Sequence, residues 1–199
     1  MSLVLVDSGG ANLGSVRYAL QRLGVEAPLV DRREDILRAE RVILPGVGAA
    51  GPAMARLAEL DLIDTLRTLR TPLLGVCVGM QILFETSEEG DAACLGLIPG
   101  RVRRLPEAPG VRVPHMGWNR LQPRIDSPLL DGIPAGSWAY YVHSYAAPAG
   151  EHCVAASVHG EPFAAMVVRG NVAGAQFHPE RSAEVGARLL ENFLRWTPA

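Results

Sequence analysis

In the first half of the chain, short apolar runs alternate with stretches whose apolar residues recur every three or four positions. The apolar runs predict buried strands at 3–6, 27–30, 41–44 and 73–76. The periodic stretches predict helices at 12–23, 35–40 and 52–70, and one that begins over 80–84. Strands that alternate with helices in this way indicate a parallel sheet covered on both faces.

From about residue 101 the pattern changes to short strand-like pieces separated by turn residues. These pieces lie at 101–105, 118–121, 139–144, 154–158, 163–168 and 173–177. A last periodic stretch predicts a helix over 183–196, with Ser182 as its N-cap. Because no repeat or linker divides the chain, we expect one α/β domain over 1–199. We expect this domain to have a mostly parallel central sheet flanked by helices and a strand-rich second half.

Composition narrows the possible partners and chemistry. The 199 residues can bury a large core without disulfides or metals, and a net charge of −2 gives no cationic field for nucleic acid or membrane. All 19 basic residues are Arg, so Schiff-base and P-loop chemistry are excluded. With no signal peptide, no membrane span and three irregularly spaced cysteines, the chain is expected to be cytoplasmic with reduced thiols.

A cysteine stands where a predicted strand turns into a helix, in Gly75-Val76-Cys77-Val78-Gly79. This is the cysteine form of a nucleophile elbow, in which flanking glycines relieve the crowding of a sharp turn. The following helix N-terminus favours the thiolate, which is the nucleophilic form. The alternative is a buried structural cysteine at a strand end.

A candidate base follows the last predicted strand, in Phe177-His178-Pro179-Glu180. If this segment is extended, the side chains of His178 and Glu180 point to the same side, and the carboxylate can orient the imidazole. Cys77, His178 and Glu180 would then form a triad. The alternative is a surface turn with a solvated glutamate.

The segment 46–51 matches the glycine-rich dinucleotide fingerprint, after a strand and before a helix. That fingerprint also needs an acidic residue at the end of the next strand, where this chain has Val76 and Cys77. We therefore favour a loop whose N–H groups stabilise an oxyanion, with Gly46 and Gly48 allowing unusual peptide orientations. Cys and His show no paired spacing for a metal.

Taken together, residues 45–48, 75–81 and 177–180 resemble the class I, or triad, glutamine amidotransferase family, in this chain order. The resemblance implies a flavodoxin-like architecture without cofactor or metal. Three further segments resemble the branch that forms glutaminase subunits of imidazole glycerol phosphate synthase. They are 7–16, 114–119 and 140–145.

The resemblance implies a role for each matching residue. Cys77 is the nucleophile, His178 the proton shuttle and Glu180 its orienting carboxylate, while Val47, Gly48 and Val78 hold the oxyanion. The residues implied to contact L-glutamine are Gly46, Gln81, His143, Ser144 and Tyr145.

The resemblance also implies a partner, a separate (β/α)8-barrel cyclase that forms a heterodimer with this chain through Asn12, Tyr140 and Arg181. Ser8 and Ala11 depart from the branch's usual Tyr and Gly, a change that does not touch the triad. Arg181 replaces the usual Lys, and because its planar guanidinium differs from an ammonium, we expect the partner contact to differ there. Two alternatives stay open. The chain could be the glutaminase subunit of another amidotransferase, or it could be a non-catalytic regulatory subunit. The intact triad speaks against the second.

Overall fold

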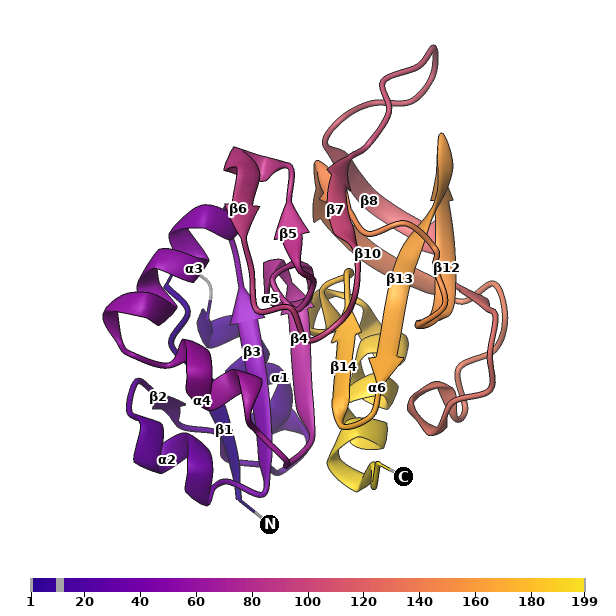
Figure 1. Cartoon of the computed structure of the whole chain (residues 1–199). Coiled ribbons are helices and arrows are strands. Elements are labelled where there is room, and N and C mark those ends of the chain that lie inside the picture. Colours follow the sequence, from indigo (N-terminus) through magenta and orange to yellow (C-terminus); the bar gives the residue numbers. More distant parts are fainter. Residues whose placement is uncertain (1, 10–12, 199) are drawn as a thin grey trace.

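The centre of the molecule is a mixed eight-stranded sheet (Figure 1). The computed structural model describes residues 2–9 and 13–198. The sheet order is β2 (Leu29–Val30), β1 (Leu3–Val6), β3 (Arg41–Gly46), β4 (Leu73–Cys77), β14 (Val172–Ala175), β13 (Glu161–Arg169), β12 (Cys153–His159) and β9 (Gln122–Pro123). The pairs from β2 to β14 are parallel and those from β14 to β9 are antiparallel. The predicted mostly parallel sheet and the strand-rich second half are confirmed.

Two smaller sheets complete the strand-rich half. One is an antiparallel ribbon of β8 (His115–Arg120) and β10 (Trp138–His143). The other has the order β11 (Tyr145–Ala146), β7 (Arg101–Arg104), β5 (Thr86–Ser87) and β6 (Ala92–Ala93). The sequence pattern did not predict β5 and β6, because two-residue strands have no periodicity to detect.

Helices cover both faces of the parallel strands. They are α1 (Leu13–Arg22), α2 (Arg33–Arg38), α3 (Ala50–Glu59), α4 (Ile63–Arg67), α5 (Val78–Gln81) and α6 (Ala183–Arg195). In Figure 1, α1 and α6 lie on one side of the sheet, and α3 and α4 lie on the other. Within the described residues, no helix is long and apolar enough to cross a membrane.

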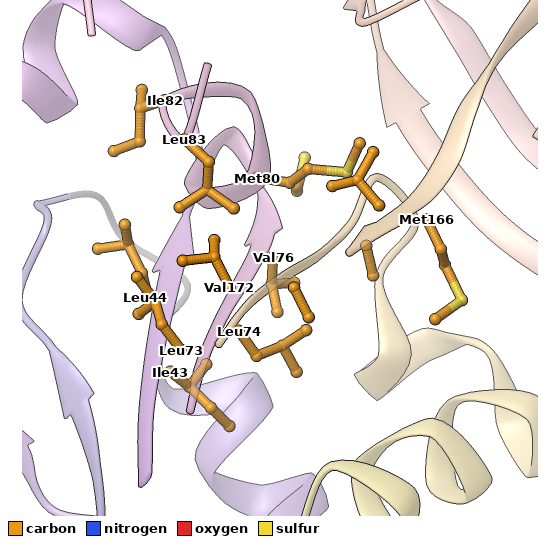
Figure 2. Packing of buried hydrophobic residues seen from close by; sticks show 14 of the residues in the cluster. Ile43, Leu44, Leu73, Leu74, Val76, Met80, Ile82, Leu83, Met166 and Val172 are labelled. Carbon is orange, nitrogen blue, oxygen red and sulfur yellow. The ribbon is translucent and has the colours of Figure 1, made fainter. Parts of the chain in front are cut away.

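The core lies between these layers. Every residue of β1, β4 and β14 is buried. Figure 2 shows buried apolar side chains of three neighbouring strands, in which Leu74 pairs with Ile43 of β3 and Leu73 pairs with Val172 of β14. These strands read as continuous apolar runs because both of their faces are covered by other layers.

The single helix predicted over 52–70 is wrong, since it is divided into α3 and α4. Asp61 has φ 55°, its N–H bonds the carbonyl of Ala58, and the Leu62 N–H bonds that of Leu57 at 2.9 Å. This is a Schellman stop, which usually has Gly at the left-handed position. Because Asp occupies that position here, no local signal in the sequence marks the break.

Several other bounds also differ from prediction. The helix α2 begins at Arg33 rather than at 35, and α5 covers Val78–Gln81 rather than 80–84. β2 contains only Leu29–Val30, while β8 begins at His115, three residues before the predicted strand.

Ser182 does not cap α6 with its side chain, contrary to prediction. Its hydroxyl donates to the His178 carbonyl at 2.7 Å and accepts the Tyr140 N–H at 2.9 Å. The hydroxyl therefore ties the turn after His178 to β10, and it is not available to the helix N–H groups.

We predict that Gly79→Ala prevents stable folding. An added Cβ at Gly79 would lie 1.8 Å from the Leu44 carbonyl oxygen, which belongs to a buried central strand. Backbone has to move to relieve this overlap, so we expect a loss of more than about 4 kcal/mol in the free energy of unfolding.

Gly51→Ala is the matched control, because Gly51 lies in α3 with nothing within 4 Å of an added Cβ. It should change stability by less than about 1 kcal/mol. Urea unfolding followed by circular dichroism measures both variants. Equal stability of the two would show that the contact at Gly79 can relax.

Candidate active site

Cys77 lies at a sharp turn between β4 and α5. Its backbone has φ 53° and ψ −112°, a conformation that side chains rarely adopt. A Cβ on Gly75 would lie 2.6 Å from the Gly79 carbonyl oxygen, and one on Gly46 would lie 2.6 Å from the Gly79 N. The glycines therefore let β3, β4 and α5 meet closely enough to hold Cys77 in its strained conformation. The strand, turn and helix expected around the cysteine are present.

The Cys77 thiol is buried and faces two polar groups. Its sulfur lies 3.9 Å from the Val142 carbonyl oxygen and 3.9 Å from Nε2 of Gln176. Gln176 is fully buried and was not among the predicted site residues. The signal in the sequence is a single amide within the otherwise apolar run 172–177, two residues before His178.

His178 and Glu180 meet by a different route from the predicted one. Nδ1 of His178 lies 2.9 Å from Oε1 of Glu180. The segment is not extended, because Pro179–Arg181 forms a 3-10 turn directly after His178. Among the described residues, the buried Oε2 of Glu180 has no hydrogen-bond partner. Its charge is therefore balanced mainly through His178.

The pKa of His178 is raised from 6.5 to about 10. Burial is the largest single influence and lowers this pKa. Hydrogen bonds and charge from Cys77 and Glu180 together outweigh it. The arrangement therefore favours an imidazolium next to the Cys77 sulfur at neutral pH.

A cavity of about 350 Å³ opens at Cys77 and His178. Most of the predicted site residues line it. They are Val47, Gly48, Cys77, Val78, Gln81, His143, Ser144, Tyr145, His178 and Arg181. The other lining residues are Glu89, Pro114 and Val142. Gly46, Glu180 and Tyr140 do not line the cavity.

The glycine-rich loop has one conformationally free glycine, not two. Gly46 is the last residue of β3 and packs on Gly79, so the expectation that it lends the loop freedom is wrong. Gly48 has φ 95° and open space around an added Cβ. The N–H of Ala50, at the start of α3, bonds a carboxylate oxygen of Glu89 at 3.1 Å. A carboxylate already occupies the place where a dinucleotide phosphate would bind.

Gln81 supports the cavity wall. Its Nε2 donates to the Tyr145 carbonyl at 2.8 Å and to Oε1 of Gln176 at 3.1 Å. Its amide nitrogen is thus engaged by protein groups. Ser8, one of the departures, donates its hydroxyl to the Pro45 carbonyl, next to the glycine-rich loop.

The predicted partner residues border an exposed aromatic surface. The Arg181 guanidinium lies 4.8 Å from the centre of the Tyr140 ring, and Tyr140 packs edge-on against Trp118. Trp118 and Trp138 are each about half exposed, and Met116 is 64% exposed. Asn12 lies outside the described residues.

Comparison with known proteins defines the class. The profile of the "Glutamine amidotransferase class-I" family matches residues 4–196. The chain belongs to the class I glutamine amidotransferase family.

Curated relatives narrow the comparison. The chain is 62% identical over 197 residues to "Imidazole glycerol phosphate synthase subunit HisH" of Xylella fastidiosa (strain Temecula1 / ATCC 700964), covering 99% of this chain and 98% of the relative. It is 61% identical over 192 residues to the protein of the same name from Xanthomonas campestris pv. campestris (strain 8004), covering 96% of each.

Solved structures share the fold at low sequence identity. A structure described as a glutamine amidotransferase has a TM-score of 0.76 at 22% identity, with 98% of each chain covered. A chain of the structure described as PurLQS from Thermotoga maritima has a TM-score of 0.70 at 22% identity, covering 98% of this chain and 99% of that one. The predicted fold class is confirmed.

Proposed function

We propose that the chain is the glutaminase subunit of an imidazole glycerol phosphate synthase. It hydrolyses L-glutamine to glutamate and ammonia and passes the ammonia to a (β/α)8-barrel cyclase for histidine biosynthesis. The observation that carries the proposal is the convergence of Cys77 and His178, backed by Glu180, at one cavity. The high identity to HisH subunits over nearly the whole chain supports the choice of synthase.

The chemistry follows from the side chains. The Cys77 thiolate attacks the side-chain amide carbon of glutamine, and the His178 imidazolium gives its proton to the leaving nitrogen as ammonia departs. A thioester with Cys77 remains. His178, now neutral, takes a proton from water as the water attacks the thioester, which releases glutamate and regenerates the thiolate. Glu180 holds His178 in orientation throughout.

The negative oxygen of each tetrahedral intermediate needs N–H donors. The Val78 N–H lies at the start of α5, directly after the nucleophile, and Val47 and Gly48 line the same cavity. We assign one donor to Val78 and a second to the peptides of Val47 and Gly48. The wall formed by Gln81 and residues 143–145 then holds the amino-acid end of the substrate, with Gly46 at the base of the loop.

A docked partner explains the exposed aromatic surface. Ammonia released into water at neutral pH would be protonated and lose its nucleophilicity, so an enclosed route to an acceptor is expected. Exposed Trp118, Trp138 and Met116 lie on the β8–β10 ribbon, which continues into the cavity wall at His143. Large aromatic residues are typical anchors of protein interfaces. We assign this surface, with Tyr140, Arg181 and Asn12, to the cyclase.

The test is ammonia release from glutamine by the purified chain, alone and with a barrel cyclase and its substrate. We expect strong stimulation by the cyclase and its ligand. If the chain is instead the glutaminase subunit of another amidotransferase, a different purified synthase should stimulate its ammonia release. Absence of hydrolysis with every synthase would overturn the proposal.

We also predict that the isolated chain hydrolyses almost no glutamine and that the partner activates it through Gly48. A left-handed glycine lets the 47–48 peptide reorient, and one misplaced oxyanion donor removes about 3 to 4 kcal/mol, on the order of 10² to 10³ in rate. Partner binding would shift the loop towards the state in which the donor faces the site.

Gly48→Ala tests this gate because an added Cβ meets no atom within 4 Å and only restricts the backbone. We expect a large change in stimulated turnover and little change in glutamine binding, with Gly51→Ala as the neutral control. Full activity of the chain without its partner would contradict gating.

A further inference from the structure

A chain of hydrogen bonds runs from the β8–β10 ribbon to the wall of the cavity. Nδ2 of Asn119 lies 3.2 Å from Nε2 of His115, and Nδ1 of His115 lies 2.9 Å from Nε2 of His143. Nδ1 of His143 lies 2.8 Å from the Tyr145 carbonyl oxygen. Asn119, His115 and His143 have no part in the proton transfers described above.

The Asn119 end fixes the direction of these bonds. The Asn119 amide nitrogen lies 2.9 Å from the Val158 carbonyl oxygen, and its amide oxygen accepts the Arg120 N–H at 2.8 Å. The NH₂ group therefore faces His115, and Nε2 of His115 has to accept. A neutral His115 then carries its proton on Nδ1 and donates it towards His143.

The Tyr145 end gives the same direction independently. A carbonyl oxygen only accepts, so Nδ1 of His143 carries a proton and its Nε2 is free to accept from His115. A protonated His143 would place two donors against each other along the chain. Burial, with a smaller contribution from the charge of His159, lowers the pKa of His115 to about 4. Burial likewise lowers the pKa of His143 to about 3, so both rings are neutral at pH 7.

Packing holds His115 in this orientation. It lies directly opposite His143 in the register of the ribbon. Its ring stacks between Tyr141, at 4.9 Å between centroids, and His159, at 4.1 Å. The donor on His115 is thus held in place before any substrate binds.

We propose that His115 is a positioning residue for the glutamine pocket, acting through His143 to hold the Tyr145 carbonyl and the 143–145 wall in the substrate-binding arrangement. The proposal rests on the proposed function. The Tyr145 carbonyl accepts from both His143 and Gln81, so its orientation depends on this chain of bonds. The turn that places Cys77 is held by close backbone contacts among β3, β4 and α5, and neither His115 nor His143 belongs to these elements. Loss of the His115 donor should therefore weaken glutamine binding more than it slows the chemistry.

The first measurement is nitrogen-15 NMR of the histidine rings at pH 7 in the intact chain, with each ring assigned by its own substitution. We expect both His115 and His143 to be neutral with the proton on Nδ1. In His115→Phe the Nε2 resonance of His143 should shift, since it loses its donor, and in His115→Asn it should return towards the wild-type position. An imidazolium, or a proton on Nε2 of either ring, would overturn the proposal.

The second measurement is glutamine hydrolysis by the chain with a barrel cyclase and its substrate. His115→Phe keeps a stacked ring but removes the donor, and it should raise KM for glutamine about tenfold while kcat changes by less than about threefold. His115→Asn places an amide N–H near the position of Nδ1 and should restore most of the KM.

His159→Phe is the matched control, because it changes the neighbouring stacked ring and leaves the chain of bonds intact. It should behave like wild type. An unchanged KM in His115→Phe, no rescue by Asn, or an equal effect of His159→Phe would reduce His115 to a packing residue. If the wild type hydrolyses no glutamine with the cyclase, the proposed function fails, and the ring tautomers still decide whether the directed chain exists.

Discussion

Replacing Cys77 with Ala should abolish glutamine-dependent synthesis and leave synthesis from added ammonia intact. Cys77 alone of the three cysteines combines the strained turn with a histidine base and the cavity. Removing a nucleophile that forms a covalent intermediate lowers kcat by on the order of 10⁴ or more. The partner's active site is untouched, so it should accept ammonia supplied from solution.

Cys94 and Cys153 provide the controls. Both are buried, and burial raises the pKa of each thiol, to about 11 in the case of Cys94. Such thiols are poor nucleophiles at neutral pH. Cys94→Ser and Cys153→Ser should therefore keep glutaminase activity, provided that the chain folds. Loss of both glutamine-dependent and ammonia-dependent synthesis in Cys77→Ala would point to a structural role.

The parallel part of the fold could be predicted because its strands are apolar on both faces. Leu3–Val6 and Leu73–Cys77 are buried throughout, so the apolar runs marked them directly. The division of the 52–70 helix could not be predicted, because Asp61 adopts the left-handed backbone that usually requires Gly. Strands of two residues, such as β5, depend on their neighbours for pairing and have no pattern of their own.

The candidate site was more predictable than the details of its support. Glycine, cysteine and histidine in fixed local spacing mark a strained turn and its base, and Cys77 and His178 do line one cavity. Gln176 and Glu89 escaped prediction because they reach the site through tertiary contacts. The Ser182 hydroxyl was assigned to a helix cap, but tertiary contact with β10 redirected it.

His178→Ala should cost more glutaminase activity than Glu180→Ala. In the proposed mechanism His178 transfers protons in both halves of the reaction, whereas Glu180 only orients it through a single 2.9 Å contact. By analogy with other triads, we expect kcat to fall by on the order of 10⁴ or more for His178→Ala and by about 10² to 10⁴ for Glu180→Ala. Ammonia release in the presence of the cyclase measures both. Near-wild-type rates in both variants would show that another residue is the base.

The same two residues predict a shifted titration. The folded-state pKa of His178 is raised from 6.5 to about 10, so its imidazolium should persist across neutral pH and be lost only as pH rises through the folded value. The stability that this group contributes is accordingly present below pH 6.5 and lost as pH approaches 10. In Glu180→Gln the carboxylate charge is removed while burial still lowers the pKa, so the midpoint should move down. Nitrogen-15 NMR of His178 follows the midpoint in both proteins, with the distant Glu191→Gln as control. An unchanged midpoint in Glu180→Gln would show that the charge of Glu180 does not raise the pKa of His178.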